Sequence, residues 1–131
     1  MPLTADRNTP LKQTDIVVIG VGAGVRIYAG SLIALTATGF AIPGKTATGL
    51  TYVGRAEESA DNTAGADGAV SVKVHRNRAF KWANDGTVTQ ARLLKPAYIV
   101  DDATVAAADG TGTRSAAGLV VGIDPDGVWV E

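Results

Sequence analysis

Residues 39–46 read GFAIPGKT and match the phosphate-binding loop pattern G-x-x-x-x-G-K-T at every fixed position. In such loops the backbone amides surround the phosphates, the lysine contacts them, and the following hydroxyl binds Mg²⁺. An aspartate that follows a buried strand often supplies a further Mg²⁺ ligand. Residues 97–102, AYIVDD, offer Asp101 in that setting. The residue types and spacing therefore fit the binding and cleavage of a nucleoside triphosphate.

The elements around this motif argue against that chemistry. A phosphate loop needs a helix that begins at the Lys-Thr pair and directs its positive end at the phosphates. Residues 46–54, TATGLTYVG, favour a strand instead, because they are rich in glycine, β-branched and aromatic residues. The chain contains one predicted helical turn, at 89–95, with Thr89 as its cap and Pro96 as its end. We interpret residues 43–45 as a turn with a solvated lysine, and nucleotide binding stays the least favoured alternative.

A second glycine-rich stretch resembles the start of a dinucleotide-binding domain. Residues 15–25 read DIVVIGVGAGV, but the third glycine position of that fingerprint holds Val25. Such domains also use an acidic residue about 20 positions further on to hold the ribose. No Asp or Glu occurs between Asp15 and Glu57. We therefore predict no dinucleotide site, no catalytic set and no cofactor.

Composition excludes several classes of site. The chain has no cysteine and one histidine, His75, so a thiolate metal site or a zinc site with several histidines cannot form within one chain. Twelve basic residues oppose thirteen acidic ones, and the net charge of −1 provides no field that would collect nucleic acid. No run approaches the about 20 apolar residues that cross a bilayer. We expect a soluble, unexported protein that binds neither nucleic acid nor membrane.

The sequence predicts an all-β protein. Sixteen glycines and many valines, threonines and alanines favour short strands and tight turns over long helices. Residues 1–14 are polar, carry two prolines and show no periodicity, which predicts an extended N-terminal arm. Residues 15–131 are expected to form a single small antiparallel β-barrel or β-sandwich. The predicted strands are 15–20, 25–37, 40–42, 50–57, 70–76, 79–83, 97–102, 104–107, 119–124 and 128–131.

Three local patterns are especially clear. In residues 70–76, valines alternate with polar residues, which predicts a half-buried strand with His75 on its polar side and residues 79–83 as its partner. Gly30 predicts a bulge or a sharp bend within the strand-like stretch 25–37. Residues 124–127, DPDG, predict a tight turn between the last two strands.

Trp82 and Trp129 each lie in a short apolar strand segment. Large aromatic side chains in such positions dominate the packing of cores and of subunit interfaces. We therefore predict that both tryptophans are anchors, either in the core or at a subunit interface.

Several ordered blocks resemble a family of small tailed-phage and prophage proteins that are regarded as capsid decoration, or cement, proteins. Members are often labelled phage recombinases of the RecA/RadA type, a label that finds no support in these residues. The likeness covers about residues 7–131 and departs at 87–96. The blocks are VRIYAGSLIALTATGFAIPG, LTYVGRAEESADNTAGADGAVSVKVHR, YIVDDATVA and GTGTRSAAGLVVGIDPDGVWVE.

The resemblance implies a structural protein rather than an enzyme. It implies an all-β body that forms a homotrimer, is made in the cytoplasm of the bacterial host, and attaches to the outside of the capsid at or near threefold positions. The partner is then the major capsid protein, but the resemblance does not say which residues touch the shell. We hypothesise that the arm is the contact segment, because a segment that orders on contact can cover a large surface, with Arg7, Asn8 and Lys12 as candidate contact residues. The alternative is a head-completion or tail protein that forms rings.

Overall fold

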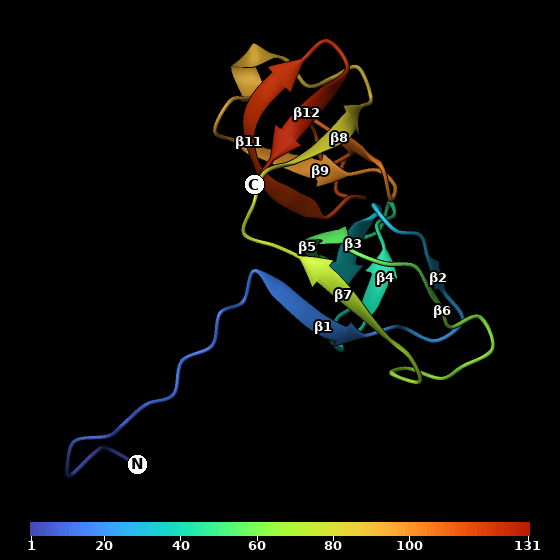
Figure 1. Ribbon diagram of the computed structural model, residues 1–131. Helices are drawn as coiled ribbons and strands as arrows, with labels where there is room; N and C mark the ends of the chain where they lie inside the picture. The colour runs from blue at the N-terminus through green and yellow to red at the C-terminus, as the bar shows by residue number, and fades with distance from the viewer.

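The computed structural model describes residues 1–131, and it consists of β-strands, connecting segments and one short 3₁₀ turn. Figure 1 shows two β-structures, one above the other, and an N-terminal segment that runs away from both. The predicted all-β class and small barrel are confirmed. The strands are β1 (Ile16–Gly20), β2 (Arg26–Ile27), β3 (Leu32–Leu35), β4 (Ala41–Pro43), β5 (Thr51–Ala56), β6 (Ala60–Asp61), β7 (Ser71–His75), β8 (Phe80–Asn84), β9 (Pro96–Ile99), β10 (Thr104–Ala106), β11 (Ala116–Asp124) and β12 (Gly127–Val130).

The lower structure is a curled sheet with the strand order β1-β7-β5-β3-β4 and antiparallel neighbours throughout. Its inner face is aliphatic because alternate residues of the strands are apolar: Val72 and Val74 are fully buried, whereas Lys73 is exposed. Just after β1, Val21 forms an isolated parallel bridge with Ala41 of β4. The two edges of the sheet therefore meet at one point only.

The upper structure is a closed five-stranded barrel with the order β10-β8-β12-β11-β9. Its neighbours are antiparallel except for β8 and β10, which run parallel. The hairpin of β11 and β12 turns at residues 124–127, where Asp124 pairs with Gly127, as the DPDG sequence predicts. Buried valines and Trp82 fill the barrel interior.

The sheet and the barrel share packing contacts. Leu32 and Ala34 belong to β3 of the sheet, yet they are buried within the hydrophobic cluster of the barrel. Tyr52 of β5 also packs against that cluster, and its hydroxyl accepts a hydrogen bond of 3.1 Å from Nε1 of Trp82. A second cluster, which includes Val72 and Val74, fills the curled sheet.

One pairing prediction is wrong. Residues 71–75 form the alternating strand β7 as predicted, but β7 pairs with β1 and β5 and not with residues 79–83. The chain turns at Asn77, which has a φ of 60°, and β8 then enters the barrel beside β12 and β10. A short hairpin between neighbouring strands is the commonest arrangement, but here a long-range pairing replaces it.

Smaller differences concern local elements. The predicted helical turn is a 3₁₀ turn at Gln90–Arg92, which the Thr89 side chain does not cap, and Pro96 begins β9. Pro43 belongs to β4 instead of a turn. The predicted bend is confirmed, since Gly30 has a φ of +85° and separates β2 from β3. Residues 58–69, which lie outside the predicted strands, contain the short strand β6, which pairs with β2.

Candidate functional site

The segment that matches the phosphate-binding pattern lies between two strands. No helix follows Lys45, which is exposed, and β5 begins at Thr51. A Cβ atom at Gly44 would lie 2.9 Å from the carbonyl oxygen of Asp101, and the Thr46 hydroxyl donates a hydrogen bond of 2.8 Å to the carbonyl of Val100. The glycine and threonine of the motif therefore hold this segment against the end of β9.

The Asp101 carboxylate also has a local structural partner. Its Oδ1 accepts a hydrogen bond of 2.9 Å from the backbone N–H of Ala103, which is an Asx turn. The neighbouring Asp102 joins the two halves of the molecule through its backbone, because its carbonyl accepts a hydrogen bond of 2.7 Å from Leu32 N–H. No group of three or more His, Cys, Asp or Glu residues that could hold a metal ion occurs.

The arm residues named above lie away from the body. Residues 1–13 are exposed throughout, and the segment extends from the start of β1 into open space (Figure 1). Arg7 donates a hydrogen bond of 2.8 Å to the Thr9 hydroxyl within the arm. At the base of the arm, Arg76 donates a hydrogen bond of 3.2 Å to the Thr14 hydroxyl. Asn8 and Lys12 are exposed.

The two tryptophans have different environments. Trp82 is 5% exposed and lies in the barrel core. Trp129 is 36% exposed, its Nε1 donates a hydrogen bond of 2.8 Å to Asp124, and Lys81 Nζ lies 5.8 Å from its ring centroid. Trp82 is thus a core anchor, and the interface role of Trp129 stays a prediction.

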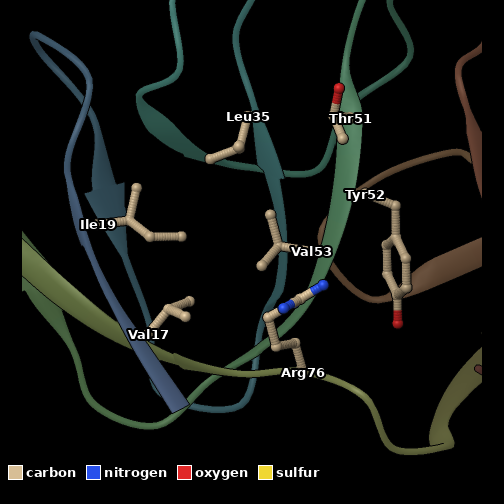
Figure 2. Close-up of a pocket in the computed structure, with 7 residues that line it drawn as sticks. All are labelled: Val17, Ile19, Leu35, Thr51, Tyr52, Val53 and Arg76. Atoms are coloured by element: carbon tan, nitrogen blue, oxygen red, sulfur yellow. The ribbon is translucent and has the colours of Figure 1, made fainter. Parts of the chain in front are cut away.

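An apolar groove lies on the inner side of the curled sheet, beside the base of the arm. Figure 2 shows Val17 and Ile19 of β1 facing Val53 of β5 and Leu35 of β3 across it, while Tyr52 points away. The groove has a volume of about 340 Å³. Its remaining lining residues are Thr51 and Arg76.

Sequence reasoning missed this groove. The sequence predicts a strand at residues 15–20, and alternation within DIVVIG places Val17 and Ile19 on one face of it. The opposite wall, from β3 and β5, is brought there by long-range pairing that no local pattern specifies.

A second recess lies between β8, β12 and β5 and contains charged side chains that are already paired. Arg55 Nη2 lies 2.6 Å from Glu57 Oε1, and this hydrogen bond is the main reason why the pKa of Glu57 is lowered. Lys81 Nζ lies 2.6 Å from Asp126 Oδ1, which raises the pKa of Lys81 and lowers that of Asp126. These cations are neutralised within the chain.

Comparisons of this chain with protein-family models, with curated proteins and with solved structures found no match. The likeness to phage decoration proteins therefore stays a prediction that depends on the sequence blocks. The structure contains no helix long and apolar enough to cross a membrane.

The buried hydroxyl of Tyr52, which joins sheet and barrel, predicts a loss of folding stability at alkaline pH. Burial raises the pKa of the Tyr52 phenol from 10.0 to about 12, an effect that the hydrogen bond from Trp82 partly offsets. The folded state therefore favours the neutral phenol more strongly than the unfolded state does. The contribution of Tyr52 to the free energy of unfolding is complete below pH 10 and is lost as the pH rises towards 12. A shift of this size corresponds to roughly 2–3 kcal/mol.

The measurement compares the pH dependence of unfolding in wild type and Tyr52→Phe. The variant is expected to be less stable at neutral pH by about 1 kcal/mol, because Trp82 Nε1–H loses its acceptor. This deficit should shrink or reverse between pH 10 and 12. Parallel curves for the two proteins would contradict the assignment.

Proposed function

We propose that the protein is a structural capsid decoration protein of a tailed phage. In this proposal it forms a homotrimer that binds the major capsid protein on the outside of the shell, at or near threefold positions, and stabilises the shell. The observation that carries the proposal is the combination of an all-β body with a 14-residue arm that leaves it, residues 1–13 of which are exposed. The ordered sequence blocks that resemble such proteins support it.

The arm supplies the proposed contact with the capsid. An extended segment can order on contact and cover a large surface without a preformed pocket. Arg7, Asn8 and Lys12 offer donors to capsid carbonyls and carboxylates, and none of them forms an ion pair within the chain. Three arms on one trimer would contact several capsid subunits at once, so modest single contacts would combine into firm attachment.

Deletion of residues 1–14 tests this mechanism. The truncated protein is expected to bind purified shells with an affinity lower by roughly 100-fold, since multivalent attachment through three arms is lost. Co-sedimentation with shells measures the affinity. The triple variant Arg7→Ala, Asn8→Ala, Lys12→Ala should show a loss in the same direction.

Lys45→Ala is the matched control, because Lys45 is an exposed lysine on the body. It should bind shells like wild type. Unchanged shell binding by the truncated protein would overturn the arm mechanism. The same control variant tests the nucleotide alternative: binding of ATP at millimolar concentration that is lost in Lys45→Ala would favour it. A solution mass larger than a trimer would favour the ring-forming alternative.

A further inference from the structure

The outer edge of β1 is unpaired. Hydrogen-bonded pairs alternate along an antiparallel ladder, and both Asp15–Arg76 and Val21–Val70 are hydrogen-bonded pairs of the β1–β7 register. Residues 17 and 19 therefore direct their backbone groups at β7, whereas residues 16, 18 and 20 direct theirs outward. No strand of the chain pairs with this edge at residues 16 and 18, whereas its end at Gly20 approaches β4 at the Val21–Ala41 bridge.

This edge also lacks the usual protection. Natural proteins guard edge strands with charges, prolines or bulges, because an exposed flat edge pairs with other chains. The sequence of β1 is IVVIG, it contains none of these devices, and its register with β7 is regular. Ile16 is 49% and Val18 65% exposed. The strand is therefore a site where another chain can add a strand.

The apolar groove adjoins the same strand. Because β1 meets β4 only through the Val21–Ala41 bridge, the curled sheet is open along the rest of β1. Val17 and Ile19 form one wall of the groove at this opening (Figure 2). A strand added to β1 would place every second side chain on the groove side. The edge and the groove together form one acceptor site for an extended segment with an aliphatic side chain.

The chain itself contains one matching segment. Residues 1–14 lie outside all strands, with a bend at Thr4 and Ala5, and residues 3–9 lie between two prolines. Leu3 is 70% exposed. In an added strand, alternation would place Leu3 and Ala5 on the groove side, so Leu3 is the aliphatic side chain that this segment can offer to the groove.

We propose that residues 3–6 of one copy add to β1 of a second copy and insert Leu3 into its groove. The inference rests on the proposed trimer and supplies its interface. Each copy gives one arm and receives one, a head-to-tail contact that can close into a ring of three. Residues 7–14 can span about 26 Å when extended, compared with a radius of gyration of about 14 Å expected for a chain of this length. Arg7, Asn8 and Lys12 then lie between the bodies, where they stay available to the shell.

Val18→Pro tests the edge. The N–H of residue 18 points outward, so proline removes a donor for the added strand and no hydrogen bond to β7. The solution mass is expected to fall threefold, from trimer to monomer, while thermal unfolding shows that the variant is folded. Val18→Thr keeps the N–H and the branched side chain and should remain a trimer.

A mixing experiment tests whether the segment that lies along β1 is the arm of a second copy. The chain has no cysteine, so Thr4→Cys and Val18→Cys variants each carry a single thiol. Alternation places residue 4 of the added strand on the same face of the sheet as residue 18, opposite the groove. A short thiol cross-linker should join the two variants when they are mixed and refolded together. Ala108→Cys, at an exposed barrel position, replaces Val18→Cys in the control mixture and should give no product.

Several outcomes would overturn the inference. The first is a folded Val18→Pro protein that is still a trimer. The second is absence of the Thr4–Val18 product. The third is cross-linking of the Thr4→Cys, Val18→Cys double variant within one chain, which would mean that the arm covers its own groove. Shell binding by a trimeric Val18→Pro protein would leave the proposed function intact. A monomeric wild type would count against both the interface and the proposed trimer.

Discussion

Replacing Trp82 with alanine is expected to lower the free energy of unfolding by about 3–5 kcal/mol. Trp82 is 5% exposed and packs in the barrel core together with Phe80, Val105, Val120 and Val128. The substitution leaves a large cavity, and it also removes the donor that binds the Tyr52 hydroxyl between sheet and barrel. Denaturant titration followed by circular dichroism measures the loss.

Trp129→Ala is the matched control for Trp82→Ala, because it removes the same side chain from the surface of the same barrel. Its contacts with Asp124 and Lys81 are solvent-accessible, so the expected cost is about 1 kcal/mol. The remaining tryptophan in Trp129→Ala should fluoresce at shorter wavelength than the one in Trp82→Ala, since it is buried. Equal stability losses in the two variants would contradict the assignment of Trp82 as the core anchor.

Gly54→Ala is expected to destabilise the protein by roughly 2–6 kcal/mol, which combines backbone strain with forced separation of two strands. Gly54 has a φ of +156°, which L side chains rarely adopt, and a Cβ atom there would clash with the carbonyl oxygen of His75 in β7. The residue lies at a register shift where β5 pairs with β3. The measurement is the midpoint of thermal or denaturant unfolding.

Gly49→Ala separates these two effects. Gly49 also has a positive φ, of +75°, but a Cβ atom would meet nothing within 4 Å. The expected cost is therefore about 1–2 kcal/mol, from the left-handed backbone alone. If Gly49→Ala proved as harmful as Gly54→Ala, close approach of β5 and β7 would not be what requires glycine at residue 54.

These predictions divide the molecule into two functional parts. The body depends on a core shared by sheet and barrel, which would hold it rigid, and the arm with the β1 edge provides the proposed contacts with other chains. Changes in the core should alter stability and leave shell binding per folded molecule unchanged. Changes at the arm or at Val18 should lower shell binding and leave the stability of the folded body unchanged.

Local sequence patterns determined the strand content of this protein. Alternation in residues 70–76, the DPDG turn at 124–127 and the bend at Gly30 depend on neighbouring residues, and all three are found where predicted. The exposed N-terminal segment follows from its lack of apolar periodicity. The absence of a helix after Lys45 also follows locally, because residues 46–54 have low helix propensity.

Only the tertiary structure decided which strands pair and what they enclose. The β7 strand binds β1 and β5 because their buried faces complete one aliphatic core, a contact between residues far apart in sequence. The roles of Gly44 and Thr46 depend on Asp101 and Val100, which follow β9 and lie more than 50 residues further along the chain. The groove at β1 exists because the sheet closes at a single bridge. Period and propensity act over a few residues, whereas such contacts depend on how complete faces pack, which local patterns do not encode.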